Sequence, residues 1–478
     1  MWRFKKNKTA WLLLLVGFIF VIFRLPSLTE PHWYGDEGIY QVVGRAILQG
    51  KVLYQEIWDN KPPMLYLLYA LVSGNLYAIK LLSLISGLLS VFAFYLLSGK
   101  LFTHPKTRYV SVFIYAVLFS TPILEGNIAN AENFMLLPVI LAAYYTLCYR
   151  ETRKVGQLIV AGLLLSFAVV TKIVAVFDFS AFFTFLLLAG YAERERFKIK
   201  PYFYYLLSTT PLFIICVVYF FLNGAFVDFM GAVFVQNVSY VGEENAFIFP
   251  MGTLIFKTVL LLLSILVITL YRKKISIATL FIYLWTVFGL YNAFFSDRPY
   301  THYLLVLLPA FSLLCGHLLE YRKKRVVTII LISVILFFAY NRFQIYKKTI
   351  SYYQNYIAFM NGGKNIVSYE NFFDSNTPRD YDLANFIDMN VMRHEEVFLW
   401  SDSAQIYALS NKLPISKYIV AYHIKFYENA DIITKEEIEN AKPKFIIQTA
   451  EGPLVNDILS SYELRYIMEG AKIYERQN

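Results

Sequence analysis

Charged residues are scarce in this chain of 478 amino acids. They make up 16% of it, against about 25% in an average soluble protein, while 58% of the chain is hydrophobic. This balance excludes an ordinary soluble protein and predicts a polytopic membrane protein with a less apolar tail. The net charge of +10 does not point to nucleic acid, because Lys and Arg gather in short loops between apolar segments.

Cysteine is equally scarce. Cys148, Cys216 and Cys315 lie in apolar segments and far apart, so neither a disulfide framework nor a zinc site is predicted. The first apolar run lacks a small-residue cleavage site, and we interpret it as an uncleaved span rather than a signal peptide. Internal repeats are missing as well.

Apolar runs long enough to cross a bilayer fill the chain up to residue 341. We expect about eleven spans, at about 10–25, 64–98, 109–123, 133–149, 156–190 (two spans), 202–222, 252–271, 276–295, 302–319 and 326–341. Span two should break near Ser73, and Thr171 and Lys172 should separate spans five and six. Loops rich in Lys and Arg alternate with loops that are poor in them, which predicts an inside N-terminus and an outside C-terminus.

The tail, residues 342–478, is more polar and reads as a small external α/β domain beside a membrane domain of residues 1–341. Strands are expected at about 396–400, 444–449, 464–467 and 471–475. Thr377 and Pro378 should open a helix, and Thr434 to Glu437 forms a capping box that should open another. A phosphate-binding glycine loop is missing from the tail, so we expect a supporting or acceptor-binding role.

The first outside loop, residues 26–63, is the stretch most suggestive of function. Apolar residues recur there with helical spacing (Ile39, Val42, Val43, Ala46 and Ile47), and polar residues fall on the opposite side (Glu37, Gln41, Arg45 and Gln49). This pattern predicts an amphipathic helix that lies in the membrane interface. Glycines along the loop allow tight turns and close approach. We therefore interpret the loop as the floor of an active site.

Asp36 and Glu37 are adjacent carboxylates at the start of this helix, followed by Tyr40. A carboxylate near a bilayer is energetically costly unless it caps a helix, pairs with a cation or takes part in catalysis. One interpretation is that Asp36 caps the helix. The other is a general base, which transfer of a sugar to a hydroxyl group requires.

Lys61 precedes two prolines directly before the second span. It could be a lysine that snorkels to the membrane surface. Alternatively, it could be a phosphate ligand, because a fixed cation stabilises a leaving phosphate. The prolines would then hold it in a rigid, extended segment.

Three further groups of polar residues are candidates. Glu125 and Glu132 share an outside loop, either as solvated residues or as a second carboxylate that positions an acceptor or binds a divalent metal together with Asp36, although no metal-ligand spacing is evident. Lys172 interrupts an apolar region, either as part of a turn or as a functional residue. Arg298, His302 and Tyr303 cluster at the start of span ten. Arg298 could pair with a phosphate and Tyr303 could hydrogen-bond to it, or the cluster could be an interfacial aromatic anchor.

These motifs resemble a known family. The sequence Asp36-Glu37…Tyr40, then Gly50…Tyr54 and Asp59…Lys61-Pro62-Pro63, resembles the first external loop of GT-C class membrane glycosyltransferases. It is most similar to bacterial relatives of protein O-mannosyltransferases and of the lipid A aminoarabinose transferase. Asn130-Ala131-Glu132, Lys172 and Tyr300-Thr301-His302-Tyr303 are also similar, and the resemblance spans roughly residues 10–320.

The resemblance implies a sugar donor on a polyprenyl phosphate at the outer leaflet and a reaction that inverts the anomeric centre. Asp36 would match the catalytic carboxylate and Lys61 the lysine at the lipid phosphate. Arg298, His302 and Tyr303 match by their position in the loop.

The sequence therefore predicts a mainly α-helical, multi-pass glycosyltransferase in the cell membrane that uses a polyprenyl-phosphate sugar. The sugar, a hexose or a pentose, and the hydroxyl acceptor stay open. A transporter for lipid-linked sugars is the alternative, but it should show internal repeats. A non-catalytic assembly partner would not need Asp36 and Lys61 together.

Overall fold

The structure, a computed structural model, describes residues 2–192, 199–237, 252–296, 298–321, 325–343, 345, 347–427, 429–452 and 458–477. The chain divides into two compact units. We call residues 1–27, 80–218 and 234–349 the bundle unit, and residues 28–79, 219–233 and 350–478 the loop–tail unit. The predicted catalytic loop thus belongs to the same compact unit as the tail. The sequence had suggested a single domain boundary near residue 342.

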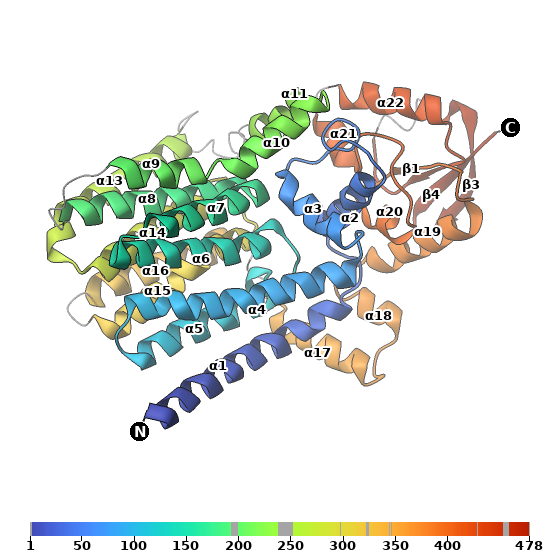
Figure 1. Cartoon of the computed structure of the whole chain (residues 1–478). Helices are drawn as coiled ribbons and strands as arrows, with labels where there is room; N and C mark the ends of the chain where they lie inside the picture. Colours follow the sequence, from blue (N-terminus) through green and yellow to red (C-terminus); the bar gives the residue numbers. More distant parts are fainter. Residues whose placement is uncertain are drawn as a thin grey trace. The chain divides into compact units, whose positions relative to one another are not determined.

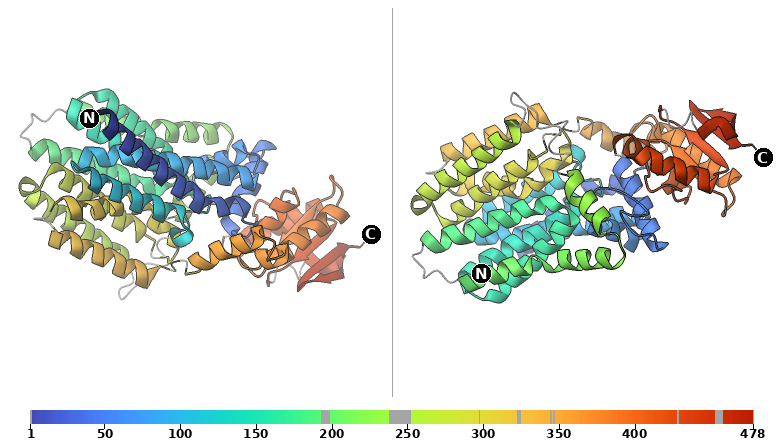
Figure 2. Two further views of the ribbon diagram at one scale, coloured as in Figure 1. Left: turned by 90° about the horizontal axis from the view of Figure 1, so that it is seen from below. Right: turned by 90° about the horizontal axis from the view of Figure 1, so that it is seen from above.

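The bundle unit consists of long apolar helices that run alongside one another (Figures 1 and 2). They are α1 (Trp2–Arg24), α4 (Leu76–Leu101), α5 (Pro105–Ser120), α6 (Ala131–Thr152), α7 (Val155–Thr171), α8 (Val176–Ala192), α9 (Ile199–Ser208), α10 (Pro211–Leu222), α13 (Gly252–Tyr271), α14 (Ile277–Ala293), α15 (Leu308–Glu320) and α16 (Arg325–Arg342). Neighbours along the chain pack together, as α6 does with α7, and distant pairs do too, as α8 does with α14. Each helix, alone or with its neighbour, coincides with an apolar run of the sequence.

Two predicted interruptions of the spans are confirmed. The break near Ser73 separates α3 (Pro63–Leu71) from α4, and Ser73 and Gly74 adopt positive φ angles of 54° and 62°. Thr171 ends α7, and Lys172 adopts an extended conformation before the chain enters α8.

The helices show a multi-pass membrane protein, but they do not fix the number of spans. Within the described residues, six helices are long and apolar enough to cross a membrane, or seven if α9 and α10, bent by 41°, form one span. Shorter apolar helices, such as α14 and α15, add to these. The expected total of about eleven spans therefore stays a prediction. The loops expected at 193–200, 223–250 and 322–325 lie partly outside the described residues.

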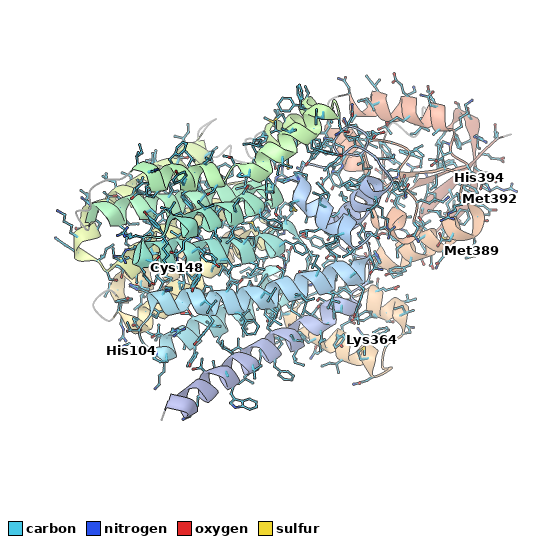
Figure 3. The ribbon with its side chains drawn as sticks, in the orientation of Figure 1. His104, Cys148, Lys364, Met389, Met392 and His394 are labelled. Carbon is cyan, nitrogen blue, oxygen red and sulfur yellow. The ribbon has the colours of Figure 1, made fainter. Side chains whose placement is uncertain are left out.

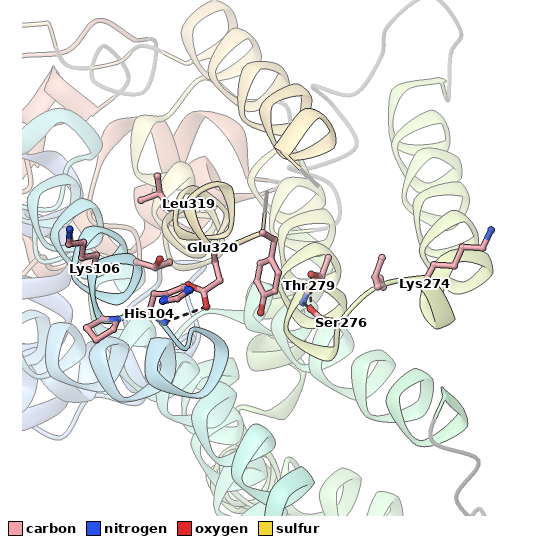
Figure 4. A pocket seen from close by; sticks show the side chains of 11 residues that line it. His104, Lys106, Lys274, Ser276, Thr279, Leu319 and Glu320 are labelled. Carbon is pink, nitrogen blue, oxygen red and sulfur yellow. Dashed lines mark hydrogen bonds between the residues drawn. The ribbon is translucent and has the colours of Figure 1, made fainter. Parts of the chain in front are cut away.

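Three connections that the sequence assigns to the inner side meet around one cavity of the bundle unit (Figure 4). The cavity measures about 820 Å³, and its lining includes His104, Lys106, Ser276 and Glu320. Glu320 accepts hydrogen bonds from the backbone N–H groups of Thr103 and His104, at 2.9 and 3.4 Å. The side of the membrane on which these connections lie stays a prediction. None of the predicted site residues lines this cavity.

The tail forms a four-stranded sheet in the loop–tail unit. Its strands are β1 (Val397–Trp400), β2 (Phe445–Gln448), β3 (Tyr462–Met468) and β4 (Ala471–Arg476), in the order β1-β2-β4-β3. β1 and β2 are parallel, with Val397 opposite Phe445, and the other two pairs are antiparallel. All four predicted strands are present, and the strands expected last in the chain form the antiparallel pair β3–β4.

The other elements of the loop–tail unit are helices. They are α2 (Gly35–Leu48), α3, α11 (Phe226–Met230), α17 (Thr349–Met360), α18 (Ile366–Glu370), α19 (Thr377–Asn390), α20 (Gln405–Leu409), α21 (Ala421–Phe426) and α22 (Ala430–Ala441). The helix predicted from Thr377 is confirmed as α19, with Pro378 in its first turn. It packs on the sheet through Phe386, whose ring centroid is 5.3 Å from that of Phe445.

The predicted capping box is wrong. Helix α22 begins at Ala430, so Thr434 lies inside it and is fully buried. Glu437 accepts a hydrogen bond from the backbone N–H of Lys417 at 3.1 Å. These two side chains thus make tertiary contacts instead of capping a helix end, which the local sequence pattern could not distinguish.

The amphipathic helix of the first loop is present as α2, but two residues of its polar side, Glu37 and Gln41, are buried. Glu37 and Gln41 are 2% and 1% exposed. α2 packs on both α3 and α20, and Arg45 Nη1 donates a 2.6 Å hydrogen bond to the carbonyl oxygen of Ala408. The tail therefore covers part of the polar side of α2, and the placement of this helix in the membrane interface stays a prediction.

Gly44 sets the distance between α2 and α3. A Cβ atom at this position would lie 2.9 Å from the backbone nitrogen of Ala70 and from the backbone carbon of Tyr69. Because backbone cannot move aside as a flexible side chain does, we expect Gly44→Ala to lower the free energy of unfolding by about 1–3 kcal/mol. Gly35→Ala is the matched control, since a Cβ there meets nothing within 4 Å. Thermal unfolding of both variants in detergent tests this, and equal stability would contradict it.

None of the three cysteines forms a disulfide bond. Cys148, Cys216 and Cys315 are all free thiols, and Cys148 lies buried among the helices of the bundle unit (Figure 3).

Candidate active site

The candidate site residues other than Arg298 form two clusters, one in each unit. The donor-loop cluster lies in the loop–tail unit and contains Asp36, Glu37, Tyr40 and Lys61 from the prediction. The Glu132 cluster lies in the bundle unit and contains Glu132, Lys172, His302 and Tyr303. Each cluster is described by itself.

In the donor-loop cluster, Asp36 and Glu37 occupy the first turn of α2. Negative charge is favoured there by the helix dipole. Tyr34 is the N-cap residue and its side chain makes no capping hydrogen bond, while Asp36 lies inside the first turn, so the interpretation of Asp36 as the N-cap is wrong. Instead, Oδ2 of Asp36 accepts a 3.2 Å hydrogen bond from the hydroxyl of Tyr40, one turn later.

Three tyrosines connect Asp36 with the segment that carries Lys61. The ring of Tyr40 packs edge-on against Tyr66 and Tyr69 of α3, with centroids 5.9 and 5.5 Å apart. Such edge-on pairs are favourable beyond the area that they bury. Tyr40 and its two ring partners are all buried, so they fix α2 against α3.

The backbone of Lys61 is held on both sides by tyrosine hydroxyls. The Lys61 N–H donates to Tyr66 at 3.0 Å, and Tyr54 donates to the Lys61 carbonyl oxygen at 2.6 Å. Tyr66 in turn donates a 2.6 Å hydrogen bond to Oδ2 of the buried Asp59. The Nζ atom of Lys61 donates to Oδ1 of Asn60 at 2.7 Å. Tyrosine hydroxyls therefore hold both backbone groups of Lys61, and the rigidity that we expected from the prolines stays a prediction.

The tail contributes residues that the sequence analysis missed. The backbone N–H of Trp58 donates to the carbonyl oxygen of Lys417 at 2.9 Å. His423 places Nε2 at 3.9 Å from Oδ1 of Asp59. Burial raises the pKa of Tyr422 well above its usual value, and the nearby charges of Asp36 and Asp59 raise it further. No local motif surrounds Tyr422 and His423, so only the fold could identify them.

In the Glu132 cluster, an almost fully buried carboxylate meets two basic groups. Glu132 lies in the first turn of α6, is 1% exposed, and forms an ion pair with Lys172. His302 Nε2 is 3.7 Å from the same carboxylate, and His302 Nδ1 is 2.9 Å from Oε2 of Glu125. Lys172 also lies over the ring of Tyr303, with Nζ 4.8 Å from the centroid. The interpretation of Glu132 as a solvated loop residue is therefore wrong.

Arg298 lies half-buried in the connection before the short 3-10 helix Thr301–Val306, which carries His302 and Tyr303. Its role as a phosphate ligand stays a prediction.

Breaking the Glu132–Lys172 pair should be costly. Lys172→Met removes the closest cation and leaves the carboxylate buried, so we expect a loss of about 3–5 kcal/mol in the free energy of unfolding. The double variant Lys172→Met/Glu132→Gln should lose markedly less, because no uncompensated charge is left behind. Thermal or denaturant unfolding in micelles of the single and double variants measures this coupling. Additive effects of the two substitutions would contradict it.

The divalent metal that the sequence left open gains no support from side-chain geometry. Among the described residues, no three or more His, Cys, Asp or Glu side chains are grouped so that they could hold a metal ion.

Comparisons with known proteins concern the fold and part of the sequence. A family model described as dolichyl-phosphate-mannose-protein mannosyltransferase matches residues 60–220, which is less than half of the chain. Among solved structures, a crystal structure of ArnT from Cupriavidus metallidurans bound to undecaprenyl phosphate covers 98% of this chain and 98% of its own. The TM-score is 0.60 and the sequence identity is 12%. No curated protein matches the chain by sequence. The structural likeness confirms the fold class that the sequence predicted.

Proposed function

We propose that this GT-C class membrane glycosyltransferase moves a hexose or pentose from a polyprenyl-phosphate donor to a hydroxyl acceptor, with inversion at the anomeric carbon. The family match and the fold together support a polyprenyl-linked glycosyltransferase and do not favour the alternative of a lipid-linked sugar transporter. The ArnT structure was determined with undecaprenyl phosphate bound, which supports a donor of this lipid class.

The donor-loop cluster carries the proposal. Within one compact unit, Tyr40 bonds to Asp36 and packs on Tyr66, and Tyr66 bonds to Lys61. A carboxylate and a cation are thereby set in one rigid framework. Sugar transfer from a lipid phosphate needs both, because the acceptor hydroxyl must lose a proton and the leaving phosphate gains charge.

The proposed reaction is a single displacement. Asp36 takes the proton of the acceptor hydroxyl while the acceptor oxygen bonds to the anomeric carbon from the face opposite the phosphate. The bond from the anomeric carbon to the phosphate oxygen breaks, and its electron pair leaves with the polyprenyl phosphate. Lys61 stabilises this anion. The neighbouring Glu37 is the second candidate for the base.

The Glu132 cluster is proposed to act on the acceptor side. A buried carboxylate that is paired with Lys172 and His302 keeps a fixed orientation, and a fixed carboxylate can hold a hydroxyl group by accepting a hydrogen bond from it. Its proposed partner is the acceptor, which could be a protein, a lipid or a glycan. We further propose that the loop of residues 26–63 and the tail lie on the outer side of the membrane, because the loops assigned to the opposite side are rich in Lys and Arg.

The test is transfer of labelled sugar in membranes that contain the chain. Hexosyl and pentosyl polyprenyl phosphates should serve as donors, nucleotide sugars should not, and added undecaprenyl phosphate should inhibit. The anomeric configuration of the product should be opposite to that of the donor. Translocation of the lipid-linked sugar without any transfer product would contradict the proposal and identify a transporter.

A further inference from the structure

The tail contributes a buried histidine to the segment that carries Lys61. His423, on α21, is 2% exposed. Its ring stands edge-on to Trp58 and Tyr422, with centroids 5.0 and 4.5 Å away. The Nδ1 atom is buried and has no hydrogen-bond partner among the described residues. Buried polar groups in native proteins rarely lack partners, so this buried imidazole is an unusual feature of the tail.

The charge state of the ring follows from its surroundings. Burial lowers the pKa of His423 to about 4, the carboxylate of Asp59 opposes this shift, and the charge of Lys61 adds to it. His423 is therefore neutral at ordinary pH and carries one N–H. The carboxylate at 3.9 Å favours that proton on Nε2, which leaves Nδ1 as the unpartnered acceptor.

From Asp59, hydrogen bonds lead on to Lys61. Asp59 accepts from the hydroxyl of Tyr66, and this hydroxyl accepts the N–H of Lys61. Trp58, which precedes Asp59, is fixed as well. It pairs with Tyr418 in a β-bridge, and its ring packs edge-on against the imidazole of His423. The imidazole thus lies next to this chain of hydrogen bonds, which holds the backbone of Lys61. At 3.9 Å, Nε2 is too far from Oδ1 of Asp59 for a hydrogen bond, and the two groups interact through the charge of the carboxylate and the dipole of the N–H group.

We infer that His423 is a positioning residue for donor binding: it orients Asp59, which through Tyr66 sets the backbone of Lys61 against the lipid phosphate. The tail is then a part of the donor site and not only a support. This inference rests on the proposed function, because the position of Lys61 matters through the phosphate that it contacts.

Two substitutions of His423 distinguish the effect of its N–H group from the effect of the packing of its ring. His423→Phe keeps an aromatic ring and removes the N–H, whereas His423→Gln keeps an N–H close to the position of Nε2. We expect His423→Phe to raise the KM for the polyprenyl-phosphate sugar about 10-fold or more, the scale on which supporting residues act, with kcat changed less than about twofold. His423→Gln should recover most of the lost affinity. His394→Phe, at an exposed histidine of the same unit, is the control and should change nothing (Figure 3).

A second measurement is independent of turnover. Undecaprenyl phosphate should raise the Tm of the native chain and of His423→Gln, and it should raise the Tm of His423→Phe clearly less. If the Phe variant does not fold, Tyr66→Phe, which removes the hydroxyl next to Lys61, should show the same rise in KM.

The outcomes distinguish the two proposals. A native chain that binds undecaprenyl phosphate but transfers no sugar from any polyprenyl donor would defeat the proposed function. The role of His423 would be overturned by an unchanged donor KM and an unchanged Tm shift in His423→Phe, or by a folded Gln variant that is as impaired as the Phe variant.

Discussion

Asp36→Asn is expected to lower kcat for sugar transfer by about 10²–10⁴-fold, the range that a general base contributes. Asparagine has nearly the same shape as aspartate, and its amide oxygen can still accept the hydrogen bond from Tyr40. The geometry of α2 should therefore survive, while the ability to take a proton is lost. The KM for the donor should change little, because the proposed contact with the donor phosphate is made by Lys61.

The measurement is the initial rate of labelled sugar transfer at saturating donor, with the amount of inserted protein determined for each variant. Asp388→Asn, which neutralises an exposed carboxylate of the same unit, is the control. Equal kcat in the native chain and Asp36→Asn would remove Asp36 as the base. Glu37→Gln would then be measured next, because Glu37 shares the first turn of α2.

Lys61→Met should reduce kcat/KM for the donor by about 10²–10³-fold, comparable with the loss of one fixed donor to a developing anion. Methionine keeps an unbranched side chain but removes the ammonium group. The backbone bonds of Lys61 to Tyr66 and Tyr54 do not involve its side chain, so the segment should keep its conformation. The effect should therefore reflect charge and not folding.

Lys61→Arg is the informative companion, since it keeps the charge but changes its shape and reach. It should be less impaired than Lys61→Met, and undecaprenyl phosphate should still raise its Tm. If both Lys61→Met and Lys61→Arg had the same donor KM as the native chain, Lys61 would be a lysine that reaches the membrane surface, which was the other interpretation of the sequence.

The pattern of helices was predictable because its causes are local. Runs of apolar residues, basic loops, Pro378 at a helix start and a Gly near a break act on the chain within a few residues of themselves. The same holds for the buried strands β1 and β2, which are short apolar runs. These elements appear in the structure close to the expected positions.

The sequence predictions were wrong where the residues of a local pattern contact a segment that is distant in the chain. Thr434 and Glu437 have the spacing of a capping box, yet they contact Ser416 and Lys417 from inside α22. Glu37 and Gln41 form a polar stripe that normally faces water, yet both are buried in the loop–tail unit. In each case a tertiary contact takes the place of the solvent contact or helix cap that such a pattern usually indicates.

By itself, the sequence determined that the chain is a multi-pass membrane protein and singled out Asp36 and Lys61 as candidates for a general base and a phosphate ligand. Only the tertiary structure decided which groups surround them. Asp59 and His423 are far apart in the chain, and no periodicity or spacing links them, because a contact between distant segments depends on the packing of whole elements. The tail is joined to the Lys61 segment by such contacts, and they are visible only once the chain is folded.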